Sequence, residues 1–191
     1  MPQIPIIRDG VARLFRRFGL DTRGVASIEM ALIFPVMLIL YFGMIDVSNL
    51  LSANRRVTLT ASTLADLVTQ ASGTLTKSDI NGFFNAAGAI MQPFAANNIS
   101  LEVFDYTKNG TNVKLSWQHK NTTANCGAAP TPDDQMKALM AEGNDVVVAR
   151  VCFTWSPVIG YVIGSSPFTL SDKLMLRPRQ STTLSCSNCS T

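Results

Sequence analysis

The side chains in this sequence that could form covalent cross-links or bind a metal are four cysteines, Cys126, Cys152, Cys186 and Cys189. They all follow a long apolar segment, so disulfides are expected if that side of a membrane is oxidising. Four cysteines allow three pairings, and proximity favours Cys126 with Cys152 and Cys186 with Cys189. A zinc site is the sharper alternative, because Cys186-x-x-Cys189 has ligand spacing, although the other two cysteines lack it. A redox-active dithiol is less favoured, because the motif is not at a helix start.

The sequence offers little else that could do chemistry. His119 is the only histidine, and it is expected in a solvated loop at the end of a polar strand. We find no nucleophile–base pattern, no phosphate-binding glycine loop and no carboxylate cluster in the sequence. The sequence therefore predicts a protein that is not an enzyme and that has neither a cofactor nor a metal.

One acidic residue, Glu29, lies inside the apolar segment. Residues 30–45 carry no charge, and residues 25–45 are long enough to cross a bilayer if Glu29 is tolerated there. An ionised carboxylate in hydrocarbon costs ~2.5 kcal/mol or more. Glu29 therefore needs either a partner charge or a position at the headgroups.

The positive charge is concentrated before this segment. The net charge is +3, and residues 1–24 alone supply it through five arginines and two aspartates. The remainder is neutral, so no nucleic-acid surface is predicted. Arginines before an apolar run keep that side in the cytoplasm while the rest crosses. A secretory signal peptide is the alternative, but no small-x-small cleavage site directly follows the run. The five arginines are Arg8, Arg13, Arg16, Arg17 and Arg23.

The apolar segment continues into an amphipathic pattern that predicts one long helix over residues 25–72, stopping near Gly73 and kinked at Pro35. We expect its later part to pack mainly against the chain's own domain. A second helix begins with a capping box of Thr76 and Asp79 and ends at Pro93. The apolar positions of the later part are Val47, Leu50, Val57, Ala61, Leu64, Val68 and Ala71.

The rest of the chain alternates between apolar and polar residues. This pattern predicts a β-hairpin with a turn at residues 108–110 and a central strand at 145–155. A short helix within 131–144, closed by Gly143, precedes the central strand; weaker strands are expected within 169–177 and around 181–185. The fold class is α+β, a long N-terminal helix followed by a small antiparallel-sheet domain with short helices. The expected organisation is a leader (1–24), a helix (25–72, transmembrane over 25–45) and a globular domain (73–191).

The residues around Glu29 also resemble a known motif. Gly24 is followed by Val25-Ala26-Ser27-Ile28-Glu29-Met30, which is similar to the cleavage motif of type IV prepilins. Residues 23–69 resemble the TadE-like family, the minor pilins or pseudopilins of the tight-adherence (Flp) pilus. Met30 departs from the family, which often has tyrosine or phenylalanine there. The positions that carry the resemblance are Gly24, Ala26, Glu29, Ala31, Leu32, Pro35, Gly43 and Asp46.

The resemblance implies a role in pilus assembly. A prepilin peptidase would cut after Gly24, so that Val25 becomes the N-terminus. Glu29 would then pair with the α-ammonium of a neighbouring subunit, which makes a buried charge tolerable. The implied partners are the peptidase, other pilin and pseudopilin subunits, inner-membrane assembly proteins and the membrane. The implied location is the bacterial inner membrane, single-pass, with the C-terminal domain periplasmic.

Two other functions remain open from the sequence. The first is an uncleaved, single-span periplasmic scaffold of the same machinery, and the second is a membrane-anchored periplasmic enzyme.

The apolar stretch at residues 155–168 is broken by Pro157, Gly160, Gly164 and Pro167. It is expected to bury against its own domain, or to meet another pilus subunit.

Overall fold

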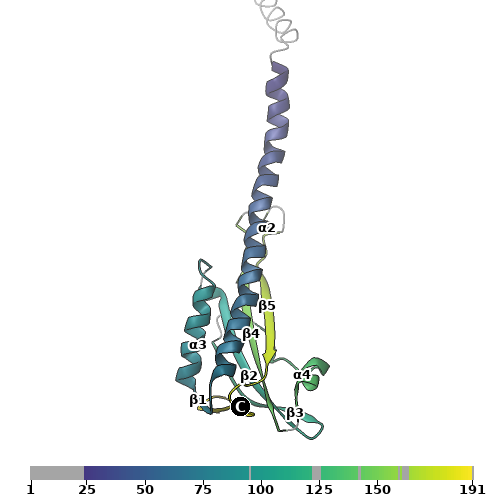
Figure 1. Cartoon of the computed structure of the whole chain (residues 1–191). Coiled ribbons are helices and arrows are strands. Elements are labelled where there is room, and N and C mark those ends of the chain that lie inside the picture. The colour runs from purple at the N-terminus through teal and green to yellow at the C-terminus, as the bar shows by residue number, and fades with distance from the viewer. Residues whose placement is uncertain are drawn as a thin grey trace, which may run out of the picture. The chain divides into compact units, whose positions relative to one another are not determined.

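A computed structural model describes residues 24–94, 96–121, 126–141, 143–158, 160 and 164–190. The leader arginines lie outside the described residues. The chain divides into two units, one reaching Ile45 and one beginning at Asp46. A long apolar helix followed by an antiparallel sheet with short helices confirms the predicted α+β class (Figure 1). The described helices and strands are α2 (Val25–Gln70), β1 (Thr74–Thr76), α3 (Lys77–Ile90), η2 (Ala96–Asn98), β2 (Ile99–Asn109), β3 (Asn112–Asn121), α4 (Asp134–Leu139), β4 (Asp145–Trp155), β5 (Phe168–Leu176) and β6 (Ser185–Ser187).

Helix α2 is continuous through Pro35 and ends at Gln70, three residues before Gly73. Its first 21 residues are almost wholly apolar, and its later part buries one face, as the spacing predicted. Val57, Leu64 and Val68 are fully buried in the core of the second unit. The first residue of the predicted stripe, Val47, is instead exposed.

The main sheet has four strands in the order β3-β2-β4-β5, all antiparallel. β4 is an interior strand, as its apolar residues on both faces predicted. The β2–β3 turn lies at Gly110 and Thr111, because β2 runs on to Asn109, so the predicted turn at 108–110 is too early. Gly110 has a φ of +62°, a left-handed conformation that glycine adopts without strain.

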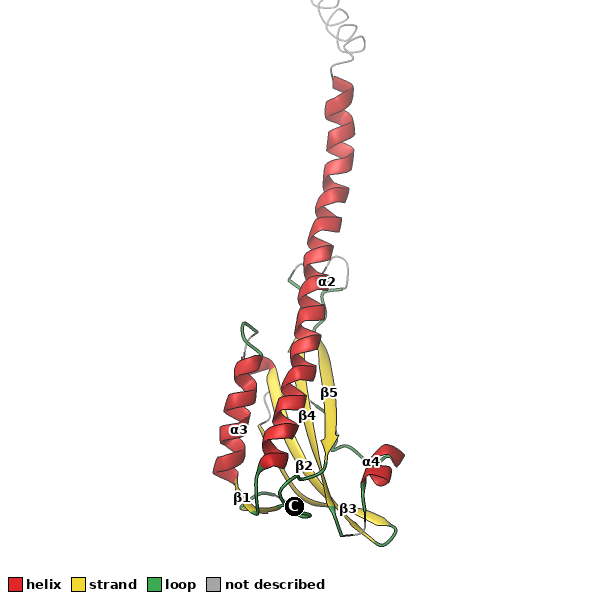
Figure 2. Ribbon diagram, in the orientation of Figure 1, coloured by secondary structure: helices red, strands yellow, loops and turns green. Residues whose placement is uncertain are grey.

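The two faces of this sheet support separate apolar clusters. Helices α2 and α3 cover one face, where Val103, Trp117 and Val151 are buried. The short helix α4 lies on the other side of the sheet (Figure 2), and its Met136 belongs to the same buried cluster as Phe104 of β2. Successive strand residues point to opposite faces, which explains why neighbouring apolar residues of β4 enter different clusters.

Helix α3 begins as predicted. The Thr76 hydroxyl accepts a bond from the Asp79 amide, and the Asp79 carboxylate accepts one from the Thr76 amide. Helix α4 is shorter than predicted, since it ends at Leu139 and Met140 already has an extended backbone. The predicted closing at Gly143 is therefore wrong.

The last predicted strand, around 181–185, is also misplaced. β6 begins at Ser185 and pairs in parallel with β1, forming a separate two-stranded sheet. The residues just before β6 form hydrogen bonds with Asp145 of β4 instead. The Thr182 carbonyl accepts from the Asp145 amide, and the Leu184 amide donates to the Asp145 carboxylate. The three-residue strand β1 has no pattern of its own that could have indicated this pairing.

Candidate processing and assembly site

The residues at the predicted cleavage point lie at the start of helix α2. The helix begins at Val25, and both Val25 and the preceding Gly24 are exposed to solvent. A Cβ added at Gly24 would meet no described atom within 4 Å. Crowding within the described chain therefore does not require glycine at this position, and any requirement for a small residue would come from a binding partner.

Glu29 lies one helical turn after Val25 on the same side of the helix, because residues four apart are neighbours on a helix surface. Its side chain is exposed, and it makes no hydrogen bond or ion pair with the described residues. A shallow hollow on this part of the helix is lined by Ser27 and by apolar side chains that include Met30 and Phe34. The carboxylate is thus available to a group from another molecule.

The helix surface around Glu29 is apolar and open. The large apolar side chains from Val25 to Ile45 are all exposed, each over at least 37% of its area. At 1.5 Å per residue, 21 residues span about 31 Å, close to the thickness of bilayer hydrocarbon. Among the described helices, α2 alone is long and apolar enough to cross a membrane, by length and composition. This surface is suited to lipid or to other apolar helices.

The four cysteines form two disulfides. Cys126 is joined to Cys152 of β4, with Cα atoms 5.7 Å apart, and Cys186 to Cys189, with Cα atoms 5.6 Å apart. This is the pairing that proximity in the sequence favours. The described residues contain no group of three or more His, Cys, Asp and Glu that could hold a metal.

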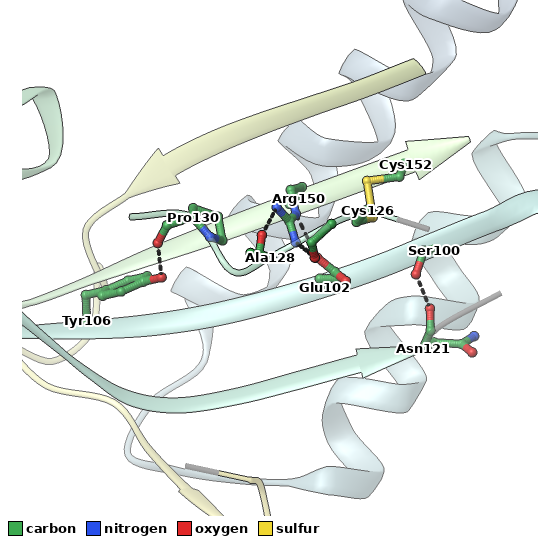
Figure 3. Close-up of polar contacts among 10 residues, drawn as sticks. Ser100, Glu102, Tyr106, Asn121, Cys126, Ala128, Pro130, Arg150 and Cys152 are labelled. Atoms are coloured by element: carbon green, nitrogen blue, oxygen red, sulfur yellow. Dashed lines mark hydrogen bonds and ion pairs between the residues drawn. A yellow bond between two sulfur atoms is a disulfide. The ribbon is translucent and has the colours of Figure 1, made fainter. Parts of the chain in front are cut away.

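The Cys126–Cys152 disulfide is one of several bonds that hold the segment at residues 126–130 against the sheet (Figure 3). Arg150 of β4 donates through Nη1 to the Ala128 carbonyl at 2.7 Å. The Tyr106 hydroxyl donates to the Pro130 carbonyl at 2.5 Å. The segment is therefore fixed by one covalent bond and by polar contacts to two different strands.

The prediction that His119 is a solvated loop residue is wrong. His119 lies in β3, is buried, and stacks on Phe84 of α3 with ring centroids 5.5 Å apart. Its Nε2 is 2.9 Å from Oδ1 of Asn81. Burial lowers the pKa of His119, and the positive charge of Lys77 lowers it further. The polar residues around His119 in the sequence gave no sign that helix α3 would cover it.

Asp46 has a structural role that the sequence reasoning missed. Its carboxylate accepts a hydrogen bond from the amide of Val158 at 3.0 Å, so it holds the start of the apolar stretch at residues 155–168. Trp155, at the beginning of this stretch, is buried and lies 5.3 Å from the ring of Phe168. Val158 itself is exposed. Residues 159 and 161–163 lie outside the described residues.

Two buried acids were also missed. Asp105 and Asp145 are both buried in the sheet, although the sequence predicts no carboxylate cluster. A signal was available, because Asp105 alternates in phase with Leu101 and Val103, and strand residues two apart share a face. Asp105 is therefore on the apolar face of its strand.

Comparisons with known proteins bear on the N-terminal region. No curated protein and no solved structure matches the chain. Residues 24–66 match the family model described as TadE-like protein. The matched region includes Gly24, Glu29, Pro35 and Asp46, and it makes up less than a quarter of the chain. This confirms the resemblance drawn from the sequence. The region that holds the exposed Gly24–Val25 junction and Glu29 is therefore a TadE-like region.

Proposed function

We propose that this chain is a minor pilin or pseudopilin of a tight-adherence (Flp) pilus, with a structural rather than an enzymatic role. One observation carries the proposal. In a TadE-like region, an exposed Gly24–Val25 junction stands at the start of an exposed apolar helix, with the Glu29 carboxylate one turn inside it. A peptidase needs an accessible junction, and an assembling subunit needs an open apolar helix.

In this proposal the arginine-rich leader stays in the cytoplasm and residues 25–45 cross the inner membrane. A prepilin peptidase cuts after Gly24 and leaves an α-ammonium on Val25. In the assembly the Glu29 carboxylate of one subunit pairs with the α-ammonium of its neighbour. Each charge then compensates the other inside a medium of low dielectric constant, where an unpaired charge would be costly.

The folded unit beginning at Asp46 would lie in the periplasm, an oxidising compartment that suits its two disulfides. This unit also supports contact with other subunits. Leu51 and Leu59 are exposed on helix α2 beside Arg55, and together they line a hollow on the helix surface. The partners would be other pilin and pseudopilin subunits and the inner-membrane assembly proteins.

The intact mass of protein extracted from membranes tests the proposal. The mature chain should begin at Val25 and contain 167 of the 191 residues, because 24 are removed. Gly24→Leu should block processing, and since its Cβ would meet no described atom, the block would not be caused by crowding within the chain. Gly19→Leu, a change in the leader away from the junction, is the matched control and should still be processed.

The contrary result is also defined. If cells with working pili contain only the full-length chain, the protein is an uncleaved, single-span scaffold of the assembly machinery. If Gly24→Leu and Gly19→Leu are both processed, Gly24 is not the recognition residue.

A further inference from the structure

Two buried carboxyl groups lie close together beneath the C-terminal part of the chain. Asp105 of β2 is 0% exposed and Asp145 of β4 is 2% exposed. Thr107 pairs with Asp145 across the two strands and shares a face with Asp105. The two acids are therefore neighbours on the sheet face that packs against α2 and α3.

The two acids differ in their hydrogen bonds. Asp145 is fully engaged, because Oδ1 accepts from the Thr107 hydroxyl at 2.5 Å and Oδ2 accepts from the Leu184 amide at 2.7 Å. The carboxylate oxygens of Asp105 have no hydrogen-bond partner that is well placed among the described residues. A buried carboxylate without donors is costly when ionised, whereas a neutral carboxyl is far less so.

The strand beside Asp105 is irregular. The β2–β3 register shifts between Asp105 and Tyr106, which leaves Ser116 as the extra residue of a β-bulge. The Ser116 hydroxyl lies 2.5 Å from the Thr107 hydroxyl. Burial raises the pKa of Asp105 to about 8, the negative charge of Asp145 adds to this, and Ser116 opposes it only in part. At neutral pH Asp105 therefore carries a proton.

Asp145 is also one of the attachment points of the C-terminal segment, defined here as residues 177–190, which is held in addition by the pairing of β6 with β1 and by two backbone bonds between Ser190 and Gln118. Besides the Leu184 amide, it binds Thr182, because its own amide donates to the Thr182 carbonyl at 2.9 Å. The indole of Trp117 donates to the Leu184 carbonyl at 2.9 Å. Nearer the start of the segment, Arg179 forms an ion pair with Asp66 of α2. Any change in the charge beside Asp145 acts directly on this attachment.

We propose that Asp105, Asp145 and Leu184 form a proton-dependent latch, in which a proton on Asp105 allows Asp145 to hold the C-terminal segment against the sheet. When Asp105 loses its proton, two negative carboxylates face each other in a buried site. The repulsion is relieved when the segment opens and water reaches both groups. Among the described residues, Asp145 is the group whose charge acts on Asp105. On the same sheet face Lys114 of β3 pairs with Thr107 but is exposed, and Arg179 is paired with Asp66.

The direction of the pH effect follows from proton binding. In the open state Asp105 is hydrated and its pKa returns toward 3.8, whereas in the closed state it is about 8. Between these values the closed state binds one more proton than the open state. The ratio of closed to open molecules therefore falls by up to about tenfold per pH unit over this interval and levels off above pH 8. Acid closes the latch and alkali loosens it.

Hydrogen exchange of the full chain in detergent, followed by mass spectrometry from pH 5 to pH 9, tests the latch. The protection of peptides covering residues 182–190, corrected for the intrinsic pH dependence of exchange, should fall as the pH rises and level off above pH 8. Asp105→Asn keeps the shape without the charge, so its protection should be independent of pH. Asp134→Asn is the control, because that carboxylate is 99% exposed, and it should follow the wild-type profile.

Three results would overturn the latch. The first is an Asp105→Asn profile equal to the wild type. The second is protection of residues 182–190 in the wild type that does not fall between pH 5 and pH 9. If Asp105→Asn does not fold, infrared spectroscopy of the wild type decides instead. The band of a protonated carboxyl should be present at pH 6 and lost above pH 8, and its absence at pH 6 is the third contrary result.

Discussion

Arg150 of β4 binds the carboxylate of Glu102 of β2 through two nitrogens, with Nε and Nη2 lying 2.7 Å and 2.5 Å from the same oxygen. The two side chains are only 12% and 4% exposed. The guanidinium also lies over the ring of Phe104 and donates to the carbonyls of Gly127 and Ala128. One cation therefore neutralises a buried acid and holds the segment that carries Cys126.

Replacing this arginine should strongly destabilise the domain. Arg150→Leu would leave the Glu102 carboxylate buried without a partner, and we expect a loss of about 3–5 kcal/mol in the free energy of unfolding. The matched control is Lys173→Leu, which breaks the Lys173–Asp133 pair, whose side chains are 41% and 37% exposed. Exposed pairs contribute about 1 kcal/mol or less. Urea unfolding of both variants in detergent is the measurement, and equal losses would contradict the assignment.

The two disulfides should differ in their effect on stability. Cys126–Cys152 closes a loop with a sequence separation of 26, and Cys186–Cys189 closes one of 3. In the chain-entropy account the first stabilises by about 3–4 kcal/mol and the second by less than about 2 kcal/mol. Paired serine variants of each disulfide, compared by urea unfolding, check the ranking. Alkylation of the native protein should label no thiol, and labelling of all four without reduction would refute both pairings.

Acidification should weaken the contact between α3 and β3. The pKa of His119 is lowered by burial and by Lys77, so the unfolded chain binds a proton at a higher pH than the folded chain. Stability contributed by neutral His119 is complete above pH 6.5 and is lost as the pH falls below it. Nuclear magnetic resonance can follow the titration directly, since the chain has one histidine. His119→Gln should remove this acid loss, and a measured pKa of 6.5 or above would disprove the reasoning.

Glu29 should matter for assembly more than for cleavage. Under the proposed function, Glu29→Gln keeps the shape and should still be processed at least in part, but it leaves a neighbour's α-ammonium without its counter-charge. Removing one member of a buried pair typically costs about 3–5 kcal/mol. The processed variant should remain in the inner membrane and be missing from sheared pili, as judged by immunoblot. Glu29→Asp, with the same charge and a shorter reach, should be intermediate. Wild-type amounts of Glu29→Gln in pili would show that the pairing is absent.

The parts of the fold that were predicted correctly depend on local patterns. The capping box at Thr76 and Asp79 involves residues three apart, and the run of apolar residues in β4 indicates an interior strand regardless of its partners. Helix α2 was predicted because its pattern persists over many turns. Such signals are complete within a short window of sequence.

The parts that were missed depend on residues distant in the chain. His119 is buried by Phe84, which lies on a different element. Asp105 lies beside a β-bulge that leaves Ser116 of the neighbouring strand as the extra residue. Asp46 binds the amide of a residue 112 positions away. No periodicity in a single segment records these contacts, since each requires two elements to be placed first.

The parallel pairing of β1 with β6 sets the order in which the chain can mature. Under the proposed function, residues 74–76 leave a membrane translocation channel early, yet their strand partner is 111 positions later, at Ser185. Helix α2 therefore emerges before the four-stranded sheet of residues 99–176 that covers its buried face, and the second unit cannot complete its fold while residues 185–187 are still in transit. A chaperone or a neighbouring subunit that binds apolar helices would have access to the buried face of α2 until the sheet has formed over it.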